Sequence, residues 1–204
     1  MLVTITNTGR MAQTVTPTAA IPLYGRSADN IRDHRHVTSL LHRIETTDTG
    51  VLVTPTLSFD ERGHQVNHMT YYCVGWSGNG EKPVDFYPTA EDFVGEGGNF
   101  ERPYAIVKNA EGVKAGTKIE GLEAVGGLHF SEITLEPEEE CSYLIFTGIT
   151  EDIQEIRNLS KTYTTREKVL EELEKTKAYW QEKVNVAYHT GDSDFNQFMH
   201  WVSF

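Results

Sequence analysis

Carboxylates gather in a glycine-rich stretch near the middle of the chain. Asp92, Glu96 and Glu101 follow one another there, with Asp85 and Glu91 just before them. A pair of carboxylates could serve glycoside chemistry, one as general acid and the other as nucleophile or base. That chemistry requires a fixed distance between the two groups, and a long loop does not define one. We therefore expect most of these carboxylates to be solvated.

Aromatic residues crowd the same third of the chain. They are Tyr71, Tyr72, Trp76, Phe86, Tyr87, Phe93, Phe100 and Tyr104. Flat apolar rings beside carboxylates and amides suit a sugar surface, but rings in strand-like runs are also typical of a protein core. For the rings inside the loop we favour core or loop-anchor positions over direct ligand contact.

Eight histidines raise the question of a metal site. Residues 34–36 read His-Arg-His, and His64 and His68 have a spacing that would share one face of a helix. Gly63 and Asn67 instead predict a turn that leads into a strand. The protease pattern His-Glu-x-x-His is absent, because no Glu follows His64. We expect no metal site.

Motifs for nucleophilic catalysis or phosphate binding are missing from the sequence. There is no Gly-x-Ser-x-Gly, and Gly95-Glu-Gly-Gly98 has a Glu where a phosphate loop needs a cation. Cys73 and Cys141 lie inside apolar strand-like runs, which favours two reduced core thiols.

The composition limits the partners. Eighteen basic residues against thirty acidic ones give a formal charge of −12 over 204 residues, which argues against nucleic acid or an anionic membrane surface as partner. Neither a basic-then-apolar leader nor a long apolar run is visible, so we expect a cytoplasmic protein.

Residues 1–160 predict an antiparallel β-sandwich, because apolar or β-branched runs alternate with turn residues. The predicted strands are Leu2–Thr6, Val37–Ile44, Val51–Phe59, Met69–Trp76, Tyr104–Val107, Leu128–Leu135 and Ser142–Thr150. Asn7–Arg10 is expected to form a hairpin turn between two strands.

Residues 161–190 predict a linker helix. From Thr164 the apolar period changes from two to about 3.6, and Thr164 with Glu167 can form a capping box. Glu171 and Lys175 form an i,i+4 pair in the favourable order. The helix carries more charge than apolar surface, which is typical of a connector.

Residues 191–204 predict the start of a new helix. Asp192 or Ser193 can cap it, and the large apolar residues that follow share one face. They are Phe195, Phe198, Met199 and Val202, with Trp201 and Phe204 adding to them. We expect this to be the first helix of a further domain, and the strand at the first residues to belong to a larger sheet.

Several segments, taken in order, resemble the glycoside hydrolase family 94 phosphorylases, which include cellobiose, chitobiose and β-1,2-oligoglucan phosphorylases. The matching segments are Thr4–Arg10, Asp85–Thr89, Asp92–Pro103, the charged linker helix and Asp194–Phe204. The elements Phe93-Val-Gly-Glu-Gly97 and Asn196–Trp201 are similar to short family motifs.

The resemblance implies a mainly β fold, a supersandwich-like antiparallel β-sandwich followed by a helical linker and the truncated first helix of an (α/α)6 barrel. It implies inverting phosphorolysis of a β-linked glucan or disaccharide, with phosphate as co-substrate and no cofactor. The family's catalytic Asp and phosphate-binding residues lie in the barrel, so no residue of this chain is expected to be catalytic. The implied partners are the helical barrel and a second subunit.

In such homodimers the sandwich of one subunit can cover the active site of the other. For this lid or substrate-side role we select five residues of the loop: Asp85, Tyr87, Asp92, Glu96 and Arg102. Two other interpretations stay open, a stand-alone carbohydrate-binding module and a purely structural dimerisation domain.

Overall fold

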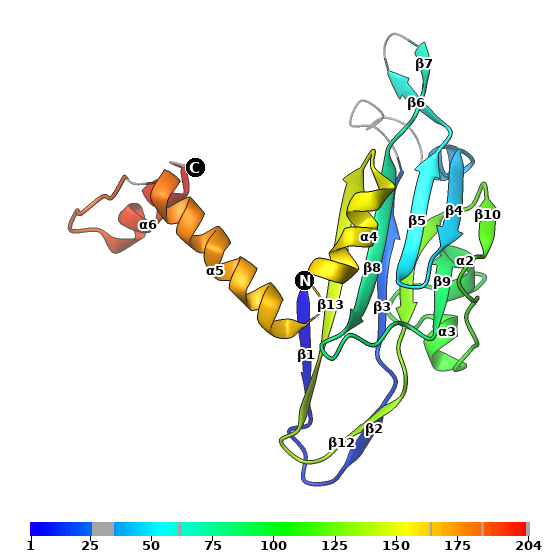
Figure 1. Ribbon diagram of the computed structural model, residues 1–204, viewed down its shortest axis with the longest axis horizontal. Helices are drawn as coiled ribbons and strands as arrows, with labels where there is room; N and C mark the ends of the chain where they lie inside the picture. Colours follow the sequence, from blue (N-terminus) through cyan, green and yellow to red (C-terminus); the bar gives the residue numbers. More distant parts are fainter. Residues whose placement is uncertain (26–34, 61–62, 164, 185, 203–204) are drawn as a thin grey trace. The chain divides into compact units, whose positions relative to one another are not determined.

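The computed structural model describes residues 1–25, 35–60, 63–163, 165–184 and 186–202. The chain divides into two units, residues 1–166 and residues 167–204. The first unit consists mainly of antiparallel β-sheets and the second of helix, as Figure 1 shows.

The larger sheet of the first unit has six antiparallel strands in the order β1-β13-β8-β5-β4-β10. Their bounds are β1 Leu2–Thr6, β13 Glu140–Thr150, β8 Thr70–Ser77, β5 Gly50–Pro55, β4 His42–Thr46 and β10 Lys118–Glu120. The long strand β13 joins the two halves, because Leu144 lies opposite Leu2 on one side and opposite Trp76 on the other.

A three-stranded sheet lies against the larger one, in the order β3 (Thr18–Leu23), β11 (Ala124–His129) and β9 (Asp85–Thr89). Apolar side chains from the facing strands fill the space between the sheets, among them Val53, Cys73, Leu128 and Ile145. β11 comes very close to β8: a Cβ added at Gly126 would lie 2.2 Å from the Cβ of Cys73. This arrangement confirms the predicted β-sandwich.

Two short ribbons extend the sandwich, β2 (Gln13–Val15) with β12 (Ile133–Leu135) and β6 (Leu57–Asp60) with β7 (Gly63–Val66). In Figure 1 they project beyond opposite ends of the sheets.

Helix α4 (Ile153–Thr162) covers the outer face of β8 and β13. Its first turn is capped by Asp152, whose carboxylate accepts the N–H of Gln154 at 2.8 Å. At its other end, Trp76 Nε1 donates to the carbonyl of Tyr163 at 2.7 Å. The ring of Phe146 stacks between the rings of Trp76 and Tyr163, with centroid distances of 5.1 and 5.6 Å.

Five local predictions were wrong. Val51–Phe59 is divided between β5 and β6, and Leu128–Leu135 between β11 and β12, which belong to different sheets. Tyr104–Val107 forms the helix α3 rather than a strand, because Pro103 starts a helical turn and no strand lies beside it. Val37–Ile44 is divided between α1 (Arg35–Ser39) and β4. Asn7–Arg10 forms a turn but no hairpin, since β1 pairs with β13 and β2 with β12. Helix α4 lies at the end of the region predicted as sandwich.

The second unit consists mainly of two helices. α5 (Arg166–Lys183) is 18 residues long, begins at the end of the first unit and has no buried residue. The predicted pair is present, since Lys175 Nζ lies 2.8 Å from Glu171 Oε1. Thr164 of the predicted capping box lies outside the described residues.

Helix α6 (Ser193–Val202) begins where the sequence predicts. Asp192 Oδ1 accepts the backbone N–H groups of Asp194 and Phe195 at 2.9 and 3.0 Å, which confirms Asp192 as the cap. Several large apolar side chains of the helix are exposed: Phe195, Phe198, Trp201 and Val202. Among the described residues, no helix is long and apolar enough to span a lipid bilayer.

Candidate functional site

Strand β9 carries the first two candidate residues into the protein interior. Asp85 Oδ1 lies 2.6 Å from His129 Nδ1 of the neighbouring strand β11, and its side chain is only 6% exposed. Tyr87 is also buried, and its hydroxyl donates to the carbonyl of Ala110 at 2.6 Å. Burial and the nearby Asp85 carboxylate raise the pKa of Tyr87, so the hydroxyl keeps its proton. The Asp85 contact therefore joins β9 to β11, and the Tyr87 contact fixes the segment at Ala110 to β9.

The helix α2 (Ala90–Val94) follows β9 directly and positions Asp92. Thr89 caps this helix, because its hydroxyl oxygen accepts the N–H of Asp92 at 3.0 Å. The same hydroxyl donates to Asp92 Oδ2 at 2.7 Å, which holds the carboxylate over the first turn. Gly95 ends the helix with φ of 78°.

Close packing joins α2 to α3. Phe93 packs on Tyr87 and Ala105, with 5.7 Å between the ring centroids of Phe93 and Tyr87. A Cβ at Gly95 would lie 2.7 Å from the Cβ of Tyr104, so glycine serves both the positive φ and the close approach. The loop predicted from the sequence is therefore a compact layer of β9, α2 and α3.

An open hollow of about 380 Å³ lies on this layer, between the two short helices and the segment from Ala110 to Val113. We call it the acidic hollow. Its lining residues are Phe86, Tyr87, Glu91, Asp92, Gly95, Glu96, Tyr104, Ala110, Glu111, Gly112 and Val113. Backbone hydrogen bonds join strand β9 to the segment from Ala110 to Val113. The N–H of Phe86 donates to the carbonyl of Val113 at 2.9 Å, and the N–H of Val113 donates to the carbonyl of Phe86 at 2.8 Å.

The charge of the acidic hollow limits what it can bind. Glu91, Asp92, Glu96 and Glu111 contribute four carboxylates, and no Lys, Arg or His is among its described lining residues. An anion such as phosphate would be repelled from this surface, because nearby like charges raise the energy of a bound anion. Carboxylates accept hydrogen bonds, so hydroxyl groups fit the hollow better, and the exposed ring of Tyr104 adds an apolar surface.

The structure brings three of the five candidate residues to the acidic hollow and separates the other two. Tyr87, Asp92 and Glu96 line it, whereas Asp85 contacts His129 and Arg102 is not among the lining residues. Sequence reasoning missed Glu111 and Tyr104 as lining residues. The pairing of Phe86 with Val113 brings Glu111 beside α2, and no short motif signals that pairing.

A protein-family model described as the supersandwich domain of glycosyl hydrolase 94 matches residues 1–166. The chain belongs to the glycosyl hydrolase 94 family. The match ends where the first unit of the structure ends, at Arg166. A search of curated proteins found no match.

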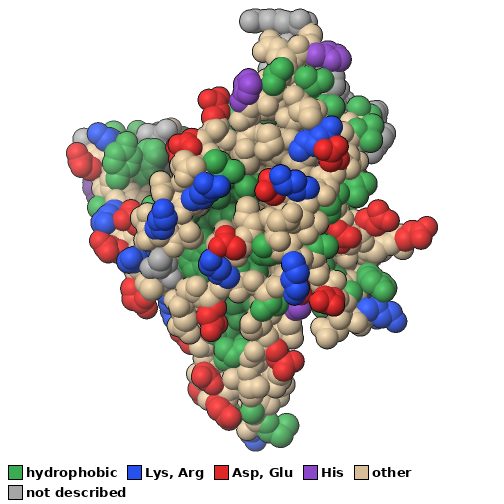
Figure 2. Space-filling view, turned by 45° about the vertical axis from the view of Figure 1, so that its right-hand side comes forward, with side chains coloured by type: hydrophobic (Ala, Val, Ile, Leu, Met, Phe, Trp, Pro, Cys, Tyr) green, Lys and Arg blue, Asp and Glu red, His purple; other side chains and the backbone are tan. Residues whose placement is uncertain are grey.

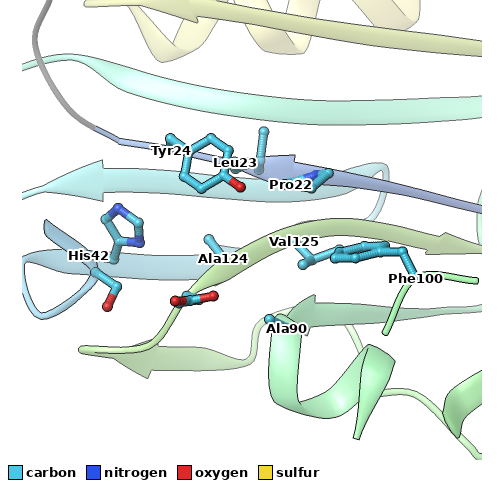
Figure 3. A pocket seen from close by; sticks show the side chains of 10 residues that line it. Pro22, Leu23, Tyr24, His42, Ala90, Phe100, Ala124 and Val125 are labelled. Atoms are coloured by element: carbon cyan, nitrogen blue, oxygen red, sulfur yellow. The ribbon is translucent and has the colours of Figure 1, made fainter. Parts of the chain in front are cut away.

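A second, smaller pocket of the supersandwich domain surrounds His42 (Figure 3). In this view His42 and Tyr24 lie toward one end and Phe100 toward the other. The space is about 20 Å³, enough for one water molecule and too small for a sugar ring. We therefore place no ligand there.

The ring of His42 is held by backbone groups on both sides. Nε2 accepts the N–H of Gly25 at 3.2 Å, and Nδ1 lies 3.1 Å from the carbonyl of Leu122. This pattern requires the neutral ring with its proton on Nδ1. Burial lowers the pKa of His42 below the usual 6.5, and the Leu122 carbonyl and Glu123 oppose that effect in part.

The stability of the supersandwich domain should therefore decrease in acid. Below pH 6.5 the unfolded chain binds a proton at His42 that the folded domain resists, so the free energy of unfolding falls with pH. One such proton changes it by at most about 1.4 kcal/mol per pH unit. Urea unfolding of wild type and His42→Gln between pH 7.5 and 5.5 measures the effect. Equal pH slopes in the two proteins would contradict it.

Elsewhere in the described part of the domain, the side chains that could bind a metal do not gather into a metal centre. Within the described ranges, no three His, Cys, Asp or Glu side chains come together as a metal site would require. Both cysteines are free thiols, and burial raises the pKa of Cys73 to about 12. Figure 2 shows acidic and basic side chains interspersed on one face. Within the domain, Arg43 Nε lies 3.3 Å from Glu120 Oε1.

Proposed function

We propose that this chain is the sandwich and linker portion of an inverting β-glucoside phosphorylase. The parent enzyme would cleave a β-linked glucan or disaccharide with phosphate and release an α-sugar 1-phosphate, in the cytoplasm and without a cofactor. The match of residues 1–166 to the glycosyl hydrolase 94 supersandwich domain carries this proposal. Catalysis and phosphate binding are assigned to the helical remainder of the polypeptide.

The acidic hollow is our candidate for the surface that faces the substrate in a homodimer. Hydroxyl-rich neutral sugars can donate hydrogen bonds to the carboxylates of Glu91, Glu96 and Glu111. The absence of cations from the described lining of the hollow is compatible with a role beside the glucan rather than beside the phosphate. In this role the hollow covers the active site of the second subunit and contacts the acceptor end of the glucan.

Replacing Glu96 and Glu111 with glutamine in the full-length enzyme should raise KM for the glucan by roughly ten-fold for each lost charged hydrogen bond. KM for phosphate should stay unchanged, because phosphate binds elsewhere. The assay measures release of sugar 1-phosphate over a panel of β-glucans. Glu101→Gln is the matched control, since Glu101 is exposed and lies outside the hollow.

The outcomes separate the function from the site. No phosphate-dependent cleavage of any β-glucan would overturn the phosphorylase proposal itself. Cleavage with unchanged glucan KM in the Glu96 and Glu111 variants would support the phosphorylase proposal and would show that the acidic hollow does not contact the substrate. Glucan retention on an affinity gel without cleavage would favour a carbohydrate-binding module.

A further inference from the structure

The asparagine side chains of the described chain differ in how firmly they are held. Four of them form hydrogen bonds through their amide groups: Asn7, Asn67, Asn99 and Asn196. Asn158 lies inside helix α4, and Asn109 precedes an alanine. Asn79 is exposed, is followed by Gly80, and makes no side-chain hydrogen bond within the described part of the chain. Asn79 therefore combines an unbonded amide with a following residue that has no side chain.

A tight turn at the end of strand β8 presents Asn79 to solvent. The N–H of Gly80 donates to the carbonyl of Ser77 at 2.8 Å, which closes the turn. The N–H of Ser77 donates to the carbonyl of Glu81 at 2.8 Å, and the hydroxyl oxygen of Ser77 accepts the N–H of Glu81 at 3.0 Å. Gly80 has φ of 87°, a value that glycine adopts without strain. The turn is therefore well defined, with Asn79 at its tip.

The covalent structure at this position allows a ring to close. The backbone nitrogen of the residue after an asparagine can reach the side-chain carbonyl carbon Cγ and form a five-membered ring with it. A Cβ on that second residue crowds the approach, and glycine has none. Asparagine is accordingly one of the thermolabile residues of proteins. Asn79 and Gly80 form the only Asn-Gly pair in the sequence, so this pair offers the least steric hindrance to the reaction.

We propose that Asn79 is a site of spontaneous deamidation in the folded protein. The Gly80 nitrogen gives its proton to hydroxide and bonds to Asn79 Cγ, and the bond from Cγ to Nδ2 breaks. The amide nitrogen takes a proton from water and leaves as ammonia, so a cyclic imide remains. A water molecule then opens the imide at either carbonyl, which leaves aspartate or isoaspartate at position 79. Water is the only co-reactant, and nothing is oxidised or reduced.

The folded turn slows this reaction without preventing it. Gly80 must release the carbonyl of Ser77 before its nitrogen can attack, and opening an exposed turn requires much less free energy than unfolding the domain. The loss of one such hydrogen bond corresponds to a rate about five-fold lower than in the unfolded chain. Isoaspartate would add one backbone atom between Ser77 and Glu81, so this product should also weaken their hydrogen bonds. The inference does not rest on the proposed phosphorolysis.

The test uses the 204-residue chain, incubated at about pH 8.5 and 37 °C in buffer and, separately, in guanidinium chloride. Mass spectrometry of proteolytic peptides follows the change from amide to acid at each asparagine. The peptide that contains Asn79 should change first, about five-fold more slowly in buffer than in the denaturant. It should give two acid products that chromatography separates, because the imide opens at either carbonyl. The peptide that contains Asn99 is the internal control, since Phe100 follows Asn99 and the Asn99 amide is hydrogen-bonded.

Asn79→Gln is the matched variant, because it keeps an amide at the tip of the turn and removes no hydrogen bond of the described chain. Its longer side chain would have to close a six-membered ring, so no acid product should form in the time that Asn79 needs to react. Retention of the wild-type Asn79 amide in buffer would overturn the proposal, whether or not the unfolded chain reacts. So would earlier deamidation of another asparagine. Formation of aspartate alone would contradict the imide, because direct hydrolysis gives no isoaspartate.

Discussion

Replacing Asp85 with alanine is expected to lower the free energy of unfolding by about 1–3 kcal/mol, because it leaves the buried Nδ1 of His129 without its hydrogen-bond partner. Asp85 Oδ1 lies 2.6 Å from His129 Nδ1, and both side chains are largely buried. Lys114 Nζ lies 3.8 Å from the other carboxylate oxygen but is mostly exposed, so it adds little. Urea unfolding of the wild type and the variant at pH 7.5 measures the loss.

The matched control is Glu96→Ala, a carboxylate of the same sequence region on the rim of the acidic hollow. Its unfolding free energy should stay within about 0.5 kcal/mol of the wild type, since it is not part of a buried network. A double-mutant cycle with His129→Ala should show that the two losses are not additive. An Asp85→Ala protein of wild-type stability with a raised KM would contradict the structural role and return Asp85 to the substrate site.

The sequence was sufficient to predict the sandwich because its strands have strong local patterns. β1, β8 and β13 lie within two residues of their predicted bounds, since each is a β-branched or aromatic run between turn residues. The segment Tyr104–Val107 has a similar composition and forms a helix. Pro103 starts its helical turn, and the turn packs against α2, where Gly95 approaches Tyr104; that packing is not contained in strand propensity.

The candidate site was only partly predictable for a related reason. Charge and aromatic density identified the region, and Asp92 and Glu96 do line the acidic hollow. Sequence cannot tell which carboxylate of a region enters the interior, because that depends on strand pairing. His129 lies opposite Asp85 in the register of β9 with β11, 44 residues away, and this turns a predicted surface residue into a buried one.

The second large effect is expected where helix α4 packs on the larger sheet. Trp76 is buried beneath α4, and its indole N–H caps the carbonyl of Tyr163, the residue that ends that helix. Phe146 and Tyr163 continue the stack of rings. Tyr163 lies three residues before α5, so this contact fixes the point at which the chain leaves the sandwich.

Trp76→Ala should therefore lower the free energy of unfolding by about 3–5 kcal/mol, the range for removing a large buried ring. Trp76→Phe retains a ring and removes only the N–H, so its loss should be about 1–2 kcal/mol. Limited proteolysis should show faster cleavage near Tyr163 in Trp76→Ala than in Leu128→Ala, a core variant of comparable expected stability loss. That comparison separates release of α4 from general destabilisation. Equal cleavage in the two variants would show that Trp76 supports the core alone and does not anchor the end of α4.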